Sequence, residues 1–184
     1  EKSITVLDEA YFEYVDDRDY PNGVELLERF PGLVVTRTFS KVYGLAGLRV
    51  GYAIASEAIT ETLNRVRQPF NVNSLALAAA EAALSDEHFV RVSREENIKG
   101  MSQLCRGFET LGLSWIRSSG NFICVKVGSK ANQIYKSMLG QGVIVRPVAN
   151  YGLPEHLRVT IGLPQENDRV LETLAMALRQ VGKA

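Results

Sequence analysis

A lysine flanked by hydroxyl and glycine residues is the feature of this sequence best suited to chemistry. Lys41 lies within the segment Thr38–Tyr52, TFSKVYGLAGLRVGY, close to Ser40 and eight residues before Arg49. Lysine side chains usually lie on solvated faces, but an amine shielded from water can bond covalently to an aldehyde. Hydroxyl groups and a guanidinium are good ligands for a phosphate group. An aldehyde and a phosphate on one molecule describe pyridoxal phosphate, so this segment predicts a site for that cofactor.

Two residues near the start of the chain could hold the ring of such a cofactor. Asp8 follows the apolar run Ile4–Leu7, and a carboxylate there would keep a pyridine nitrogen protonated, so that the ring can accept electrons. A helix cap or a turn residue is the alternative reading of Asp8. Tyr11 could donate to the phenolate oxygen of the ring, or it could be a packed aromatic residue.

The elements expected around these residues form an α/β arrangement. The runs Ile4–Leu7 and Leu33–Thr38 are typical of strands that are buried on both faces, as in a parallel sheet. Helical spacing over Val24–Phe30 between them predicts a strand–helix–strand unit. Lys41 then follows a buried strand, where open α/β sheets place their ligands. Three further elements are expected: a strand over Arg49–Ala55, a helix over Glu57–Val66 after Ser56, and an alanine-rich helix capped by Asn73 or Ser74.

The pattern changes after the alanine-rich helix, and we place a domain boundary near residue 85, between domains 1–85 and 86–184. The second domain is expected to be a compact α+β unit that starts with a long helix ending at Gly112, a typical position for a capping glycine. Its expected elements are helix Glu87–Leu111, strand Phe122–Val127, helix Ala131–Leu139, strand Val143–Arg146, strand Leu157–Ile161 and helix Glu166–Val181.

Composition excludes several classes of function. Lysine plus arginine equals aspartate plus glutamate at 21 each, so no basic excess indicates a nucleic acid or an anionic membrane as partner. No apolar run approaches the roughly 20 residues of a membrane span. Two separated cysteines, Cys105 and Cys124, and two separated histidines favour reduced thiols in a cytoplasmic protein and make a metal site improbable.

The start of the chain suggests an entry in the middle of a fold. Glu1-Lys2-Ser3 contains no methionine and leads at once into an apolar run. We expect the chain to be a piece of a longer protein; an ordinary chain with its initiator trimmed is the alternative.

Taken together, these motifs resemble the fold-type-I pyridoxal-phosphate-dependent aminotransferases, and among them most closely the histidinol-phosphate aminotransferase family. Single short motifs of this kind are weak signals, but here several occur in the order and spacing of the family over essentially the whole chain. They are Asp8-Glu9-Ala10-Tyr11, Ser40-Lys41, Gly44–Gly51, Gln68–Asn73, Gly120-Asn121-Phe122, Arg146-Pro147 and Leu157–Gly162.

The resemblance implies a fold and a set of cofactor contacts. The chain would be the carboxyl-terminal part of the large domain, with a mostly parallel sheet and helices, followed by the α+β small domain. Lys41 would bond to the cofactor aldehyde and serve as the acid and base of the proton shift. The other implied cofactor-binding residues are Asp8 at the pyridine nitrogen, Tyr11 at the ring oxygen, and Thr38, Ser40 and Arg49 at the phosphate.

The resemblance also implies substrates and a partner. Arg158 would bind the substrate α-carboxylate, Arg146 would lie near the substrate phosphate, and Asn121 would line the pocket; a surface arginine, a solvated arginine and a turn residue are the respective alternatives. The implied reaction converts histidinol phosphate and 2-oxoglutarate to imidazole-acetol phosphate and glutamate in histidine biosynthesis, in a homodimer. A threonine-phosphate decarboxylase, an aromatic aminotransferase and a folded fragment without activity remain alternatives, and we expect this chain alone to be inactive.

Overall fold

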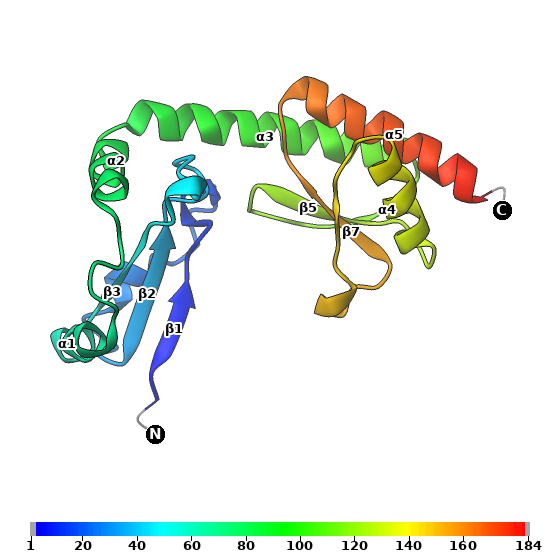
Figure 1. The fold of residues 1–184 in the computed structure, drawn as a ribbon. Coiled ribbons are helices and arrows are strands. Elements are labelled where there is room, and N and C mark those ends of the chain that lie inside the picture. Colours follow the sequence, from blue (N-terminus) through cyan, green and yellow to red (C-terminus); the bar gives the residue numbers. More distant parts are fainter. Residues whose placement is uncertain (1–2, 183–184) are drawn as a thin grey trace. The chain divides into compact units, whose positions relative to one another are not determined.

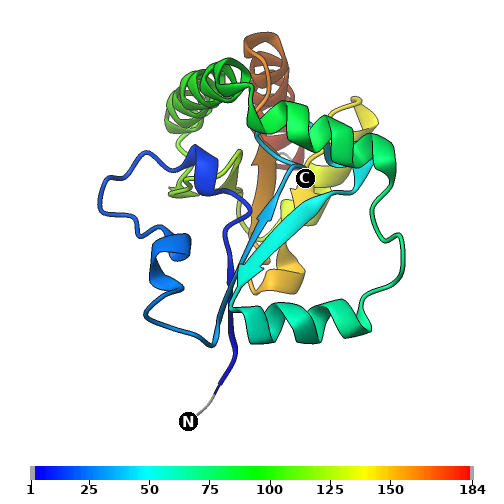
Figure 2. The same ribbon diagram turned by 90° about the vertical axis from the view of Figure 1, so that its left-hand side faces the viewer.

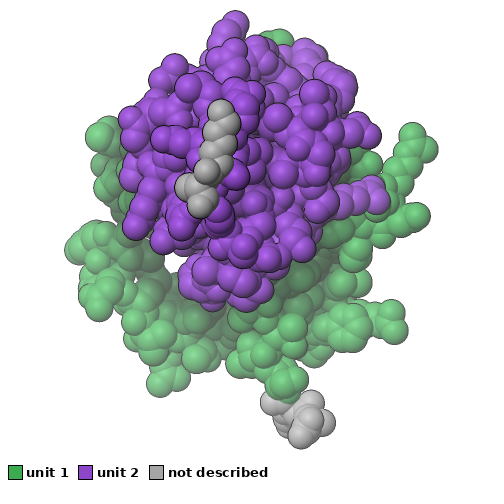
Figure 3. Space-filling view, turned by 90° about the vertical axis from the view of Figure 1, so that its right-hand side faces the viewer, with its two compact units in different colours: residues 1–94 green, residues 95–184 purple. Residues whose placement is uncertain are grey.

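The computed structural model describes residues 3–182 and divides the chain into two compact units, residues 1–94 and 95–184 (Figure 3). Each unit has its own sheet. In chain order, the first unit contains β1 (Thr5–Asp8), the 3-10 helices η1 (Phe12–Tyr14) and η2 (Gly23–Leu26), β2 (Leu33–Thr38), the 3-10 helix η3 (Ala46–Leu48), β3 (Gly51–Ala55), α1 (Glu57–Val66), α2 (Ser74–Leu84) and the start of α3 (Glu87–Thr110).

β2 is the central strand of the three-stranded sheet in the first unit (Figures 1 and 2). β1 runs parallel to β2, with Asp8 opposite Thr36, as expected for strands joined by a crossover. β3 runs antiparallel to β2, with Gly51 opposite Thr38, so the sheet is mixed. The apolar residues at the start of β2 are buried, as a central strand requires.

Two expectations for this unit were wrong. The first strand is not buried on both faces: Ile4 and Val6 are 67% and 63% exposed, because no element among residues 3–182 covers that face of the strand. The helix expected over Val24–Phe30 is only the short 3-10 helix η2. The stretch before Pro31 is too short to offset the cost of nucleating an α-helix, and proline cannot continue one.

The helices of the first unit follow the sequence pattern closely. α1 has the predicted bounds, and α2 is capped by Asn73, whose Oδ1 accepts a hydrogen bond from the Ala76 backbone N–H at 2.8 Å. Small side chains allow α2 to approach the sheet: Ala76 and Ala80 are buried against Phe39 and Val50.

The second unit is a four-stranded antiparallel sheet with helices on one face (Figure 1). The strand order is β4-β5-β7-β6, and the core between sheet and helices includes Phe108, Ile123, Met138, Leu157 and Leu174. Besides the continuation of α3, its elements are β4 (Trp115–Ile116), β5 (Phe122–Lys126), α4 (Ala131–Gly140), β6 (Arg146–Pro147), the 3-10 helix η4 (Ala149–Tyr151), β7 (His156–Thr160) and α5 (Pro164–Gly182).

The strand expected over Val143–Arg146 is largely absent from the ladder. Val143 and Val145 are buried while Ile144 between them is 80% exposed, so the segment alternates like a strand, but only β6 pairs with β7. The alternating pattern reports which side chains are buried and does not establish pairing. β4 was not expected, since two residues carry no periodicity.

The division between the units falls inside α3, after Arg94, whereas the sequence placed a domain boundary before this helix, at residue 85. α3 ends one residue before the expected end, at Thr110, and Gly112 beyond it has a φ of 70°, in the left-handed region that glycine adopts readily. Over residues 3–182, no helix is at once long and apolar enough to cross a membrane.

Candidate functional site

The residues predicted to hold the cofactor lie where the strands of the first unit's sheet begin or end. Asp8 ends β1, Thr38 ends β2 and Gly51 begins β3. Because β1 and β2 are parallel and β3 is antiparallel to them, these three strand termini lie at the same end of the sheet. Lys41 follows three residues after β2. This is the carboxyl end of the two parallel strands, where α/β sheets usually bind their ligands.

An amine lies close to a phenol ring at this end of the sheet, and Asp8 at the end of β1 supplies a carboxylate. Lys41 is half-buried, and its Nζ lies 5.5 Å from the centroid of the Tyr11 ring. Asp8 is exposed, and its Oδ1 accepts a hydrogen bond from the Ala10 backbone N–H at 3.1 Å. Asp8 thus makes the turn contact that was its alternative reading, while its carboxylate stays open to solvent.

Hydroxyl groups and a guanidinium gather in the loop between β2 and β3. Thr38 Oγ1 accepts a hydrogen bond from the Ser40 backbone N–H at 3.1 Å. Arg49 Nη1 lies 3.4 Å from Ser40 Oγ and donates to the Ala46 carbonyl oxygen at 2.7 Å. Arg49 is exposed and has a φ of 55°. A cation beside two hydroxyls is suited to bind an anionic group such as a phosphate.

Buried apolar side chains hold this loop in place. Phe39, Val42 and Val50 are each less than 10% exposed, so the polar residues between them stay on the open side. A Cβ atom at Gly51 would lie 2.8 Å from the carbonyl oxygen of Arg37. Only glycine therefore permits β3 to approach β2 this closely at the end of the loop.

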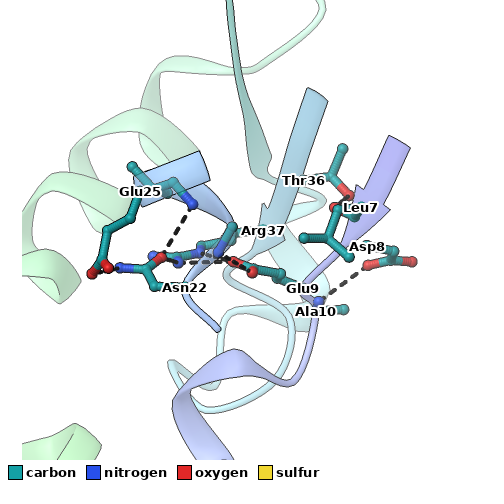
Figure 4. A network of polar contacts seen from close by, with 10 residues as sticks. Leu7, Asp8, Glu9, Ala10, Asn22, Glu25, Thr36 and Arg37 are labelled. Carbon is teal, nitrogen blue, oxygen red and sulfur yellow. Dashed lines mark hydrogen bonds and ion pairs between the residues drawn. The ribbon is translucent and has the colours of Figure 1, made fainter. Parts of the chain in front are cut away.

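A buried ion pair beside Asp8 was not singled out from the sequence. Glu9 is 1% exposed and points away from Asp8, towards Arg37 (Figure 4). Glu9 Oε2 accepts hydrogen bonds from Arg37 Nη2 at 2.8 Å and Nε at 3.0 Å, and Glu9 Oε1 accepts one from the Gly23 backbone N–H at 2.8 Å. Strand alternation after an exposed Asp8 could have placed Glu9 inward, but carboxylates are rarely buried.

The residues predicted to bind substrate all belong to the second unit. Arg158 on β7 lies directly opposite Cys124 on β5 and Arg146 on β6, so these three side chains share one face of the sheet. Arg158 is half-buried, and its guanidinium carbon lies 4.8 Å from the Phe122 ring centroid. Two neighbouring arginines on one face are suited to bind an anion.

Arg146 and Asn121 are less enclosed. Arg146 is exposed and donates from Nη2 to the Tyr151 hydroxyl at 3.2 Å. Asn121 is half-buried at the start of β5, and its backbone carbonyl accepts a hydrogen bond from the Ile161 N–H at 2.9 Å. This is the contact of a strand-entry residue, the alternative reading for Asn121.

Burial and the charge of Arg158 shift the pKa of the Cys124 thiol on this face in opposite directions. Burial raises the pKa of Cys124, and the nearby Arg158 charge partly opposes that rise. The thiol is therefore mainly protonated at neutral pH, and Arg158 has no thiolate partner there. Within residues 3–182, no three or more histidine, cysteine, aspartate or glutamate side chains gather in a way that could hold a metal ion.

Comparisons with known proteins cover nearly the whole chain. Residues 1–174 match the sequence profile of the aminotransferase class I and II family. Histidinol-phosphate aminotransferase 2 of Pseudomonas fluorescens is 60% identical over 178 residues, which are 97% of this chain and 48% of that protein. Histidinol-phosphate aminotransferase 2 of Pseudomonas aeruginosa is 59% identical over 95% of this chain and 47% of its own length.

A solved structure agrees with these relatives. Histidinol-phosphate aminotransferase from Sinorhizobium meliloti, in complex with pyridoxal 5′-phosphate, superposes with a TM-score of 0.87 at 30% identity, over 96% of this chain and 49% of that one. The chain therefore spans about half the length of the curated relatives it matches.

Proposed function

The chain belongs to the class I and II aminotransferase family and has the α/β fold of the fold-type-I enzymes, and from this premise we propose that the protein transfers amino groups with pyridoxal phosphate as cofactor. The observation that carries the proposal is the placement of Lys41. It follows β2 at the carboxyl end of the parallel strands, with its Nζ 5.5 Å from the centroid of the Tyr11 ring, in the loop that also carries Ser40 and Arg49.

The side chains at the carboxyl end of the parallel strands fit pyridoxal phosphate. Arg49, Ser40 and Thr38 supply a cation and hydroxyls for the phosphate. The open carboxylate of Asp8 is suited to a protonated pyridine nitrogen, and the hydroxyl of Tyr11 to the ring oxygen. The half-buried amine of Lys41 is suited to covalent attachment to the aldehyde. When bound, the cofactor supplies an aldehyde that bonds to amines and a protonated ring that withdraws electrons from the substrate carbon.

The remaining chemistry belongs to residues of the chain. With the cofactor and substrate bound, Lys41 Nζ would accept the proton of the substrate α-carbon as a general base. The carboxylate of Asp8 would hold the proton of the ring nitrogen. Arg158 orients the substrate through its α-carboxylate, with a paired contact that its planar guanidinium allows.

For the substrates, we propose histidinol phosphate with 2-oxoglutarate as the amino acceptor, giving imidazole-acetol phosphate and glutamate in histidine biosynthesis. The support is the name shared by the relatives at 59% and 60% identity. Arg146 beside Arg158 offers a second cation for an anionic substrate group. Arg146 and Asn121 are proposed as pocket residues on this basis.

Covalent attachment of the cofactor is the direct test. The whole protein is titrated with pyridoxal phosphate, reduced with borohydride and mapped by peptide mass. We expect the label on Lys41, its loss in Lys41→Ala, and its retention in Lys136→Ala, a matched change at an exposed lysine on α4. Equal labelling of several lysines would refute the assignment.

Substrate specificity is tested on the whole protein. Glutamate formation from 2-oxoglutarate is compared with histidinol phosphate, with histidinol and with an aromatic amino acid as donor, and carbon dioxide release is measured with threonine phosphate. Formation of glutamate mainly with histidinol phosphate is the expected result. Release of carbon dioxide, or equal rates with an aromatic donor, would favour the alternatives.

We also propose a homodimer in the cytoplasm. Exposed apolar side chains in the first unit, among them Val66, Phe70 and Leu75, are suited to a protein partner. The two cysteines are free thiols, which suits a reducing compartment. Sedimentation of the whole protein tests the dimer.

A further inference from the structure

The Glu9–Arg37 pair is a buried charged group that none of the proposed steps uses. Glu9 directly follows Asp8, and Arg37 precedes Lys41 by four residues on β2. The pair therefore joins the two segments that carry the proposed ring contacts and the proposed reactive amine. Both charges are well shielded from water: the exposed fraction of the side chain is 0% for Glu9 and 14% for Arg37.

Glu9 is fixed through its backbone as well as its side chain. Its N–H donates to the Thr36 carbonyl oxygen at 2.9 Å, and its own carbonyl accepts from the Phe12 N–H at 3.1 Å. The first bond continues the β1–β2 pairing, and the second starts η1. Glu9 is thus an inward-pointing anchor of the turn that holds Asp8 and Tyr11.

Arg37 is held from several directions. Its Nη2 donates to Asn22 Oδ1 at 2.8 Å as well as to Glu9 (Figure 4), and its guanidinium carbon lies 3.9 Å from the centroid of the Phe12 ring. Burial by itself lowers the pKa of Arg37, but hydrogen bonds to Glu9 and Tyr52 outweigh burial and raise the pKa above its ordinary value. Arg37 therefore stays charged, and a rigid planar donor faces Glu9.

The space around the carboxylate is closely matched to it. A Cβ atom at Gly23 would lie 2.7 Å from Glu9 Oε1 and 2.6 Å from Leu7 Cδ2. The carboxylate thus has little freedom to shift. Buried ion pairs are weak contributors to stability, and fixing one arrangement of the chain is one of their attested uses.

We propose that Glu9 and Arg37 are positioning residues that fix the turn of Asp8 and Tyr11 against the strand end that leads to Lys41. The inference rests on the proposed function for its consequence, a higher affinity for pyridoxal phosphate. Neither residue touches the cofactor in this role. Without the pair, Asp8 and Tyr11 remain on the chain but are no longer held in one position relative to Lys41.

Amide hydrogen exchange of the chain without cofactor tests the anchor itself. In Glu9→Gln we expect exchange at Ala10, Tyr11 and Phe12 to become about tenfold faster, because a buried hydrogen-bonded charge pair is broken. Amides of Val34 and Val35 in the central strand should stay protected. Glu155→Gln is the matched control: it breaks the exposed Lys126–Glu155 pair of the second unit and should leave the turn unchanged.

Two exchange results would overturn the proposal. Unchanged exchange at Phe12 would mean that the pair does not hold the turn. Equal acceleration in the turn and at Val34 and Val35 would mean that the pair only maintains the fold. Arg37→Lys, which keeps the charge but not the planar fork, should give a smaller acceleration than Arg37→Leu.

A cycle of variants tests whether the pair acts through Asp8 and Tyr11. In the whole protein, Glu9→Gln as the single change should lower the affinity for pyridoxal phosphate by about tenfold. Added to Asp8→Asn/Tyr11→Phe, it should lower the affinity by less than about threefold, because residues that act through one another are not additive. The same loss in both backgrounds, or no loss in either, would refute the positioning role.

Failure of the proposed function gives a different result. If pyridoxal phosphate fails to attach to Lys41 in the whole protein, the cofactor assignment is rejected. Exchange at Phe12 in Glu9→Gln would still decide whether the pair fixes the turn.

Discussion

Replacing Arg49 by glycine separates the role of its backbone from that of its guanidinium. Arg49 has a φ of 55° and a ψ of 52°, in the left-handed region that costs an ordinary L-residue about 1–2 kcal/mol. Glycine adopts this region without that cost. Arg49→Gly therefore relieves backbone strain, and it removes the cation beside Ser40 Oγ.

The effects on stability nearly cancel. Relief of strain contributes about 1–2 kcal/mol. Against it stand the greater freedom of glycine in the unfolded chain, about 0.5–1 kcal/mol, and the lost hydrogen bond to the Ala46 carbonyl, about 0.5–1.5 kcal/mol. We expect the free energy of unfolding to change by less than about 1 kcal/mol.

Loss of the Arg49 guanidinium should weaken cofactor binding, and nothing in the variant offsets this loss. Hydrogen bonds to a charged group contribute about 1.5–3 kcal/mol, and the exposure of Arg49 favours the lower end of that range. Affinity for pyridoxal phosphate should therefore fall by about tenfold, since about 1.4 kcal/mol is a factor of ten.

Two measurements on the same variant check this reasoning. Urea unfolding gives the stability, and absorbance titration with pyridoxal phosphate, with inorganic phosphate as competitor, gives the affinity. Arg49→Lys is the control that keeps a charge and the strained backbone, and its affinity should lie between the other two. Unchanged affinity in Arg49→Gly would refute the phosphate role, and a stability loss above about 2 kcal/mol would refute the strain estimate.

Four further changes have defined outcomes. Asp8→Asn should leave urea unfolding unchanged and lower turnover of the whole protein by about a hundredfold or more, because about 2.7 kcal/mol of barrier is a factor of a hundred; near-normal turnover would contradict the role of the carboxylate. Arg158→Lys should raise the KM for every amino acid substrate and leave cofactor affinity unchanged, whereas loss of cofactor would place Arg158 at the wrong group. Partial burial raises the pKa of Glu13, so its contribution to stability is present below the ordinary glutamate pKa and is lost as pH rises through the raised value. Glu13→Gln should flatten that fall of stability, measured by urea unfolding between acidic and neutral pH; an unchanged slope would argue against the raised pKa. The chain alone should bind pyridoxal phosphate weakly and self-associate through its exposed apolar side chains, and Phe70→Ser, at a side chain 97% exposed, should increase the monomer fraction in sedimentation; a monodisperse monomer with micromolar affinity would contradict both expectations.

Local signals in the sequence were sufficient for several parts of the molecule. Asn73 precedes a run of small helix-forming residues and caps α2, because capping depends on groups within one turn. The bounds of α1 follow from its spacing in the same way. Lys41 could be predicted to follow a buried strand, because that strand begins with the apolar run Leu33–Val35.

Other features depend on partners far away in the sequence. Ile4 and Val6 have the pattern of a buried strand and are exposed, because burial depends on the neighbours of a strand and its own sequence does not specify them. The direction of β3 and the loss of most of the strand expected near Val143 have the same cause. Periodicity indicates which side chains share a face, and pairing is decided by the whole sheet.

By itself, the sequence determined which chemical groups this protein has and roughly where along the strands they stand: an amine at Lys41, a carboxylate at Asp8 and a guanidinium at Arg158. Only the tertiary structure decided that Glu9 is buried against Arg37 while its neighbour Asp8 is open to solvent, and that Arg158 lies between Cys124 and Arg146. The physical reason is that residue type and local spacing fix the chemistry of a side chain, whereas its burial and its charged neighbours come from segments that meet only when the chain folds.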